Sequence, residues 1–114
     1  MTIWTGWEKH SSDAKTYNAG CPGIGMEGAR WIAEDVQARV TGCDKFPSDA
    51  VPNPDPACAL CVHGYLQTRC GIVNQENMVV SKLAADQVYT FTYMYSPVPI
   101  TGATGSMGAP LDIH

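Results

Sequence analysis

The sequence of 114 residues is short of basic side chains. Lys and Arg number 7 against 11 for Asp and Glu, which gives a formal net charge of −4 at pH 7. Proteins that bind the nucleic-acid backbone usually carry the opposite sign. The sequence also lacks an apolar run long enough to cross a bilayer, and its start lacks the basic and apolar regions of a signal peptide. We therefore expect a cytoplasmic protein that binds neither nucleic acid nor membrane.

Cysteine is too scarce for a disulfide scaffold, which takes a share of about 8 to 10%. The 5 cysteines are an odd number, so reduced thiols are the simplest expectation. Cys58 and Cys61 form a Cys-x-x-Cys pair, and His63 and Cys70 follow, which raises a zinc or redox reading. All four fall on one expected helix, where their offsets do not converge on a point. The spacing therefore favours buried apolar thiols over a zinc or redox site.

Histidine and the common catalytic motifs are scarce as well. The three histidines are His10, His63 and the terminal His114, so this chain alone offers no histidine-rich metal site. No Gly-x-Ser-x-Gly elbow is present, which argues against a serine hydrolase. The glycine-rich segment Gly102–Gly108 lacks the Gly-Lys-Ser/Thr ending of a P-loop. A structural turn or a substrate-facing loop is favoured there over phosphate binding.

The first half of the chain predicts a helix, a strand and a loop. Residues 24–38 predict a helix, because apolar side chains recur there at helical spacing: Ala29, Ile32, Ala33 and Val36. Residues 39–44 read as a short buried strand that ends on Asp44. The segment 46–56 holds four prolines, which exclude a helix or a central strand. The length fits a single domain spanning residues 1–114, with helices covering a sheet.

The second half continues the alternation of helices and strands. We expect a helix over residues 57–70, ended by Gly71, and a short strand that begins at Ile72. Residues 88–95 predict a strand, because four aromatic side chains recur there with a period of two. A last strand is expected at residues 111–113. The fold class is α/β, with mixed strand directions.

His63 and Glu76 are the candidate chemical groups. They flank a helix-to-strand turn, and both residue types serve as metal ligands or as general acids and bases. On spacing alone, a surface or capping histidine remains the favoured reading of His63.

An ordered set of motifs nevertheless resembles one known family. In chain order they are Thr5-Gly6-Trp7, Tyr17-Asn18-Ala19-Gly20-Cys21-Pro22-Gly23-Ile24-Gly25, Gly42-Cys43-Asp44, Val62-His63, Gly71-Ile72, Glu76-Asn77-Met78, Leu83-Ala84, Pro97-Val98-Pro99-Ile100 and Thr101-Gly102-Ala103-Thr104-Gly105-Ser106. They resemble the putative cyclase family, whose members include kynurenine formamidase and isatin hydrolase. The resemblance covers nearly the whole chain.

The resemblance implies a metal-dependent hydrolase of cyclic or formyl amides or lactones, with a swivelling β/β/α fold and often a dimer. A zinc or manganese ion in such a site activates a water molecule for attack on the carbonyl. By position, His63 and Glu76 match the residues that act at the metal as ligand or proton-transfer group. Asp44 matches an aspartate that organises the site from outside the metal shell.

One departure from the family pattern leaves two hypotheses. The family's His-x-Gly-Thr-His-x-Asp metal motif lies in an N-terminal half without a counterpart in these residues. In the first hypothesis, the chain is the C-terminal part of a hydrolase, completed by a missing N-terminal half or by homo-oligomer formation. In the second, it is a truncated, non-catalytic binding or assembly module. Retention of His63 and Glu76 favours the first, and the missing motif favours the second.

Overall fold

A computed structural model describes residues 1–113. The chain forms two compact units. The first unit runs from Met1 to Ser81, and the second contains the residues from Lys82 onward. The α/β class is confirmed, and both parallel and antiparallel strand pairs occur, in separate sheets. None of the helices within residues 1–113 has the length and apolar content of a membrane span.

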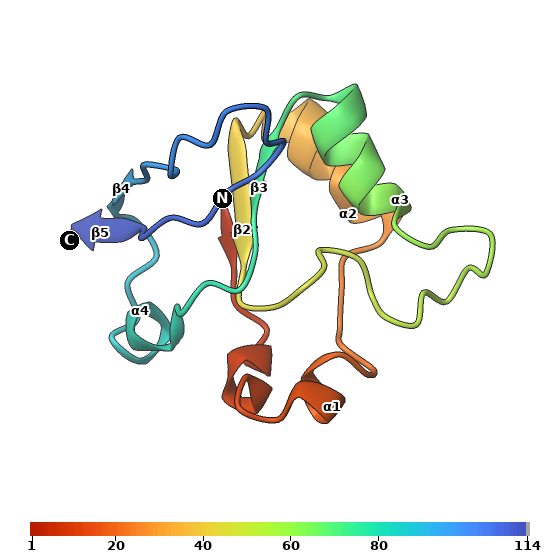
Figure 1. Ribbon diagram of the computed structural model, residues 1–114, viewed down its shortest axis with the longest axis horizontal. Coiled ribbons are helices and arrows are strands. Elements are labelled where there is room, and N and C mark those ends of the chain that lie inside the picture. The colour runs from red at the N-terminus through yellow and green to blue at the C-terminus, as the bar shows by residue number, and fades with distance from the viewer. Residues whose placement is uncertain (114) are drawn as a thin grey trace. The chain divides into compact units, whose positions relative to one another are not determined.

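The first unit is built around a parallel sheet of three strands in the order β1-β2-β3. Strand β2 pairs with both neighbours, with Ile3 opposite Cys43 and Thr41 opposite Asn74. The helices that lead directly into β2 and into β3 lie on one side of this sheet (Figure 1). The elements of the unit are β1 (Thr2–Ile3), η1 (Trp7–His10), α1 (Ala14–Tyr17), α2 (Met26–Arg30), η2 (Trp31–Asp35), β2 (Val40–Cys43), α3 (Cys61–His63), η3 (Gly64–Arg69) and β3 (Val73–Gln75).

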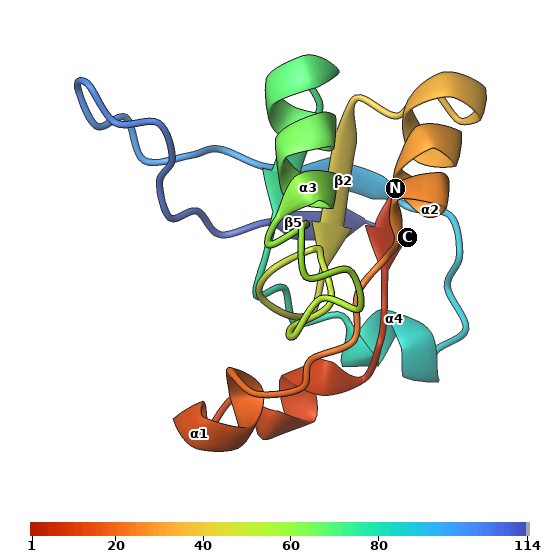
Figure 2. The same ribbon diagram turned by 90° about the vertical axis from the view of Figure 1, so that its right-hand side faces the viewer.

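The two longer helices of this unit follow the predicted segments closely. Segments α2 and η2 are continuous and cover most of the expected helix at residues 24–38. Segments α3 and η3 are also continuous, but begin at Cys61 because residues 58–60 still belong to the loop. Gly71 has a φ of +66° and follows this helix, as predicted for a residue that ends it. Figure 1 shows both helices on the same side of β2, and Figure 2 is viewed from that side.

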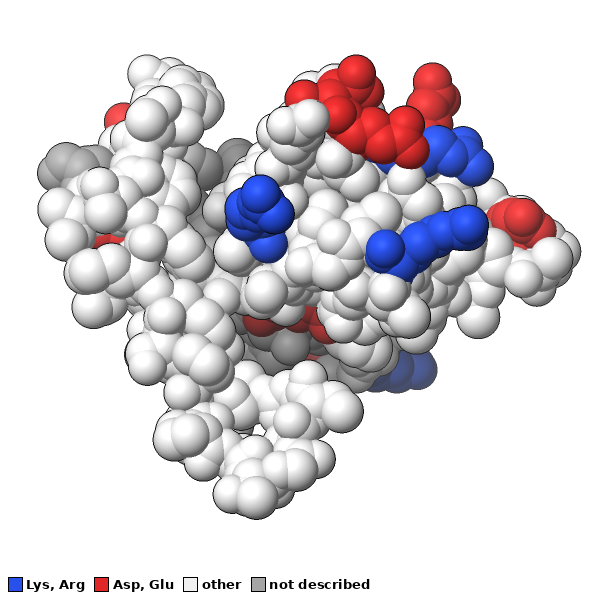
Figure 3. Space-filling model, turned by 90° about the horizontal axis from the view of Figure 1, so that it is seen from above, with Lys and Arg blue, Asp and Glu red and all other residues white. Residues whose placement is uncertain are grey.

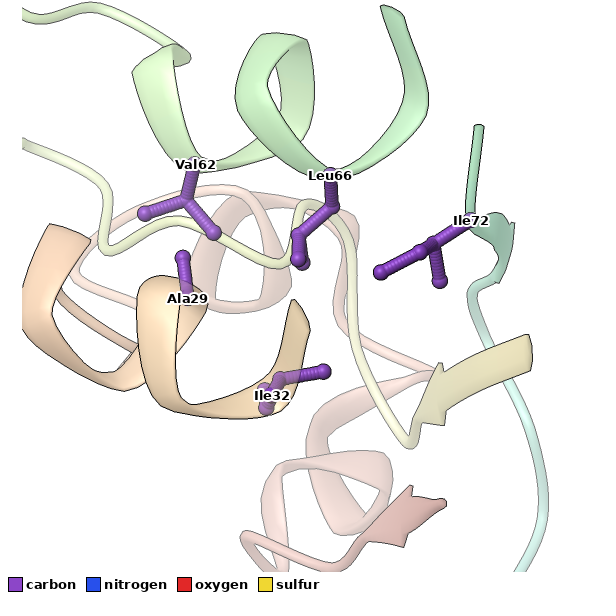
Figure 4. Packing of buried hydrophobic residues seen from close by; sticks show 5 residues of the cluster. All are labelled: Ala29, Ile32, Val62, Leu66 and Ile72. Atoms are coloured by element: carbon purple, nitrogen blue, oxygen red, sulfur yellow. The ribbon is translucent and has the colours of Figure 1, made fainter. Parts of the chain in front are cut away.

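Apolar side chains from the two helices form the core of the first unit. Figure 4 shows Val62 and Leu66 facing Ala29 and Ile32, with Ile72 beside them at the entry to β3. All five are at most 5% exposed. The helical spacing predicted Ala29 and Ile32 on this face, whereas Val36 is 40% exposed. Val36 keeps helical dihedral angles, and Gln37 directly after it adopts a φ of +52°, which ends the helix.

The second unit is a small antiparallel arrangement. Helix α4 (Ser81–Ala85) leads into it, and β4 (Thr92–Met94) pairs with β5 (Leu111–Ile113). The strand expected over residues 88–95 is therefore shorter than predicted, and Tyr89 is 85% exposed. Phe91 and Tyr93 do lie on one side and meet edge to face, with ring centroids 6.4 Å apart.

Charged side chains are sparse on the face drawn in Figure 3. Separate Lys and Arg side chains and small groups of Asp and Glu stand among uncharged surface. This distribution agrees with the low charged fraction of the sequence, 16%.

The expectation of five reduced cysteines is wrong. Cys58 and Cys61 form a disulfide, while the free thiols of Cys21 and Cys43 are buried and that of Cys70 is exposed. Sequence reasoning placed Cys58 on the helix, but it lies in the preceding loop. The loop lets its side chain turn toward Cys61, with the two Cα atoms 5.3 Å apart, within the range that a disulfide spans.

We expect Leu66→Ala to lower the free energy of unfolding by about 2–5 kcal/mol, because it opens a cavity between the two helices. Denaturant unfolding followed by circular dichroism measures this change. Leu60→Ala is the matched control, since Leu60 is 43% exposed and its truncation should cost far less. Equal losses in the two variants would contradict the assigned core.

Thiol labelling under non-reducing conditions should modify one cysteine per native chain, Cys70, and three per denatured chain. Burial raises the pKa of the Cys43 thiol, so the reactive thiolate is disfavoured there as well as inaccessible. Mass spectrometry of the labelled peptides identifies the sites. Rapid native labelling of Cys21 or Cys43 would contradict this arrangement.

Candidate functional site

The candidate residues gather at the carboxyl edge of the parallel sheet. Thr5 lies beyond β1, Asp44 directly follows β2, and Glu76 directly follows β3. Because the three strands are parallel, their carboxyl ends share one edge. This edge is the usual ligand-binding region of open α/β sheets.

His63 and Glu76 form a close pair. His63 Nδ1 lies 3.3 Å from Glu76 Oε1, and the side chains are 31% and 16% exposed. The pair therefore joins the helix that contains His63 to the end of β3. The partly exposed imidazole is accessible to a small molecule, and the more buried carboxylate can orient it.

Backbone and amide groups fix the Glu76 carboxylate. Asn74 Nδ2 donates to Glu76 Oε1 at 2.8 Å, and the Ser48 amide donates to the same oxygen at 3.3 Å. Asn74 Oδ1 accepts from the hydroxyls of Ser48 and Thr41, at 3.0 and 3.3 Å. Asn74 thus links β2, the following loop and Glu76 in one network.

Asn74 and Ser48 were missed by the sequence reasoning. One signal was available for Asn74, because residues two apart on a strand share a face, and Asn74 stands two before Glu76. No comparable signal exists for Ser48, which reaches Glu76 only because the proline-rich loop folds back over the sheet edge.

Asp44 lies at the same edge, but its hydrogen-bond partners differ from those of Glu76. Its Oδ1 accepts from the amide and hydroxyl of Thr5 at 2.9 and 2.7 Å, and its Oδ2 accepts from the amide of Glu8 at 3.4 Å. The side chain is fully buried. Burial acts to raise the pKa of Asp44, but the hydrogen bonds from Thr5 and Glu8 outweigh it and hold the pKa below the ordinary value of 3.8. Asp44 therefore remains a carboxylate that secures the segment after β1.

A hollow of about 890 Å³ opens beside Asp44, a size typical of small-molecule sites. Tyr17, on its wall, donates from its hydroxyl to Asn77 Oδ1 at 2.7 Å. Burial, together with the negative charge of Asp44, raises the pKa of the Tyr17 phenol, which stays protonated. The hollow is not lined by His63 or Glu76, but Asn77 on its wall directly follows Glu76. A smaller cavity of about 180 Å³ is lined by Ser48 and Asn74.

The loop after β2 is held by two buried charged residues. Lys45 Nζ donates to the carbonyl oxygens of Pro47 and Asp49, the latter at 3.1 Å. Asp49 accepts from the amides of Val62 and His63 with its two carboxylate oxygens, each at 2.9 Å. Asp49 therefore fixes the helix start that presents His63, a role that sequence reasoning also missed.

Gly23 allows a second segment to approach this loop. A Cβ atom at this position would lie 1.9 Å from the Ala50 nitrogen and 2.0 Å from the Asp49 carbonyl carbon. Any side chain would therefore displace the backbone that contains Asp49. The Ile24 amide donates to the Ser48 carbonyl at 3.1 Å alongside this contact.

The pair of His63 and Glu76 offers two donors toward a metal. The 3.3 Å separation of Nδ1 and Oε1 matches two neighbouring ligands of one tetrahedral ion. A catalytic zinc site takes three protein ligands, and within residues 1–113 no third His, Cys, Asp or Glu joins this pair in a cluster of potential ligands. The described residues thus supply part of a metal site and do not complete it.

The cluster of potential ligands that the structure does contain lies elsewhere. Asp49, Cys58 and Cys61 place their donor atoms within 4.8 Å of one another. The sequence argument against a shared site of Cys58, Cys61, His63 and Cys70 agrees with this cluster, which contains neither His63 nor Cys70. Asp49 was not considered, because its approach depends on the fold of the proline-rich loop.

We expect Asp44→Asn to reduce the free energy of unfolding at pH 7 by about 1–3 kcal/mol, the usual range for buried hydrogen bonds to a charged group. Because the folded-state pKa of Asp44 is depressed below 3.8, its stabilising effect is present above that pH and disappears as the pH falls through the folded-state pKa. The difference between the variant and the natural chain should therefore shrink in acid. Urea unfolding between pH 7 and pH 3 measures this difference in the free energy of unfolding. Asp35→Asn is the control, since Asp35 is exposed. A difference that does not change with pH would contradict the assignment of Asp44 as a buried carboxylate.

Part of the chain is similar to a known protein family. Residues 1–50 match the family model described as Putative cyclase. The matched stretch contains β1, the helix formed by α2 and η2, and β2 followed by Asp44. No significant match was found among curated proteins or among solved structures. Residues 1–50 are therefore similar to the putative cyclase family, in agreement with the motifs that the first part of the sequence contains.

Proposed function

We propose that the chain belongs to a metal-dependent hydrolase that cleaves a cyclic or formyl amide or a lactone, and that its α/β fold is the C-terminal part of a swivelling β/β/α fold. The observation that carries this proposal is the contact between His63 Nδ1 and Glu76 Oε1 at the carboxyl edge of the sheet. The family match supports the same ancestry.

His63 is the proposed proton-transfer group. Glu76 holds the imidazole through Nδ1, which leaves Nε2 as the nitrogen that takes a proton from the attacking water and returns it to the leaving group. Asn74 and the Ser48 amide keep the carboxylate in place during this transfer. The hollow beside Asp44 and Tyr17 is the proposed entry for the amide or lactone.

A divalent zinc or manganese ion would supply a water of lowered pKa and polarise the carbonyl. In the alternative role of metal ligands, His63 and Glu76 would provide two donors toward this ion, and the further ligands would come from outside the described residues. We propose that a second copy of the chain, or an N-terminal half with the family's metal motif, supplies them.

In protein with the disulfide between Cys58 and Cys61 intact, we expect His63→Ala to lower bound zinc or manganese at least tenfold. The same variant should lower kcat/KM on a formyl amide or lactone by about 100-fold or more. Glu76→Gln should reduce kcat/KM by about 10–100-fold, because it weakens the group that orients His63. Elemental analysis, native mass spectrometry and a hydrolysis assay on the same metal-supplemented samples provide the readouts.

His10→Ala and Glu27→Gln are the matched controls, since neither belongs to the network around the pair. They should leave metal content and rate unchanged. A natural chain that binds no metal and hydrolyses neither substrate class would contradict the proposal and favour the non-catalytic binding or assembly module.

A further inference from the structure

A second chemical site lies in front of the helix that presents His63. Asp49, Cys58 and Cys61 bring three potential ligand atoms within 4.8 Å of one another. Cys58 and Cys61 are joined as a disulfide, and in that form their sulfurs are not thiolate ligands. The cluster therefore has two chemically distinct states, oxidised and reduced.

Asp49 is held in position independently of the cysteines. Its carboxylate is fully buried and accepts from the amides of Val62 and His63 at 2.9 Å. Lys45 Nζ donates to the Asp49 carbonyl at 3.1 Å and fixes the backbone as well. Reduction of the disulfide would leave this residue in place, so one ligand of the cluster is preorganised.

The carboxylate also has capacity for a metal. Two carboxylate oxygens offer about four lone-pair directions, and the two amide bonds use two of them. The remaining directions allow one oxygen to bind a cation while the helix contact persists.

The disulfide is accessible to a small reductant. Cys58 and Cys61 are both half-buried, and a hollow of about 300 Å³ is lined by both of them and by Asn53. Asn53 Nδ2 donates to Cys58 Sγ at 3.3 Å. Thiol–disulfide exchange requires this kind of access to a sulfur.

We propose that Cys58 and Cys61 form a reversible redox switch, whose dithiol form binds a zinc ion together with Asp49 and whose disulfide form does not. Two thiolates and one carboxylate oxygen are a donor set suited to zinc, with the fourth position left to water. The site is separate from the pair of His63 and Glu76, and its test does not depend on hydrolysis.

The redox step is a two-electron exchange with a dithiol reductant. The reductant gives two electrons and two protons, the bond between the two sulfurs breaks, Cys58 and Cys61 become thiols, and the reductant becomes a disulfide. Zinc binding then releases the two thiol protons to water. In the reverse step a disulfide compound accepts two electrons from the two thiolates and takes up two protons from water, so that its own bond between sulfurs breaks to give two thiols. The bond between Cys58 and Cys61 re-forms, and the zinc ion is released.

The test uses the full chain in a Cys70→Ser background, which removes the exposed free thiol. Cobalt(II) is added as a zinc substitute to the oxidised protein and to protein reduced with a dithiol that is then removed. We expect a near-ultraviolet band of thiolate-to-cobalt charge transfer at one equivalent in the reduced protein alone, reversed by zinc. Cys58→Ser and Cys61→Ser should each weaken cobalt binding at least about 100-fold. A loss of this size exceeds the usual effect of replacing a residue that only hydrogen-bonds to a metal ligand.

Asp49→Asn should weaken cobalt binding, because it removes the carboxylate ligand. The side-chain oxygen of the asparagine can still accept one hydrogen bond from the helix amides. His63→Ala should leave the band unchanged, which separates this site from the proposed hydrolase site. If a serine variant fails to keep its circular dichroism spectrum, alkylation of the reduced Cys70→Ser protein gives an independent way to block the thiols. The proposal is overturned if the reduced protein shows no band, if the oxidised protein binds cobalt equally well, or if blocking Cys58 and Cys61 leaves binding unchanged.

Discussion

The contact of the Asp49 carboxylate with the amides of Val62 and His63 is the constraint on which the candidate site depends. It connects the loop after β2 to the start of the helix that presents His63. A buried carboxylate is tolerated here because charge-assisted bonds to backbone N–H groups replace its hydration. Loss of this contact would free the helix start and separate His63 from Glu76.

The buried Lys45 extends the same constraint to the backbone of the loop. Its ammonium donates to two loop carbonyls, so a cation is satisfied by peptide oxygens in a segment where four prolines remove backbone donors. The loop thereby keeps a fixed path across the sheet edge. As a result, the Ser48 amide reaches Glu76. The loop therefore contacts both Glu76 and, through Asp49, the helix start that contains His63.

Sequence reasoning captured the parts of the fold that depend on local periodicity. Ala29 and Ile32 lie on the buried face as predicted, and Gly71 ends its helix as predicted. The strand predicted to end at Asp44 ends one residue earlier, at Cys43. Sequence reasoning also selected His63 and Glu76, which flank a helix-to-strand turn and lie 3.3 Å apart. Their role at a metal was implied by the family resemblance alone. Asp49 and Ser48 could not be found this way, because their partners lie 13 or more residues away across an aperiodic loop.

The two parts of the proline-rich loop should differ in how well they tolerate insertions and substitutions. The first part is pinned by the bonds from Ile24 to Ser48 and from Val51 to Cys21, and Gly23 leaves no space beside it. Residues 52–57 are mostly exposed and lie outside these bonds. Insertions and sequence drift among descendants of this chain should therefore accumulate after Val51, while the segment from Lys45 to Ala50 keeps its length.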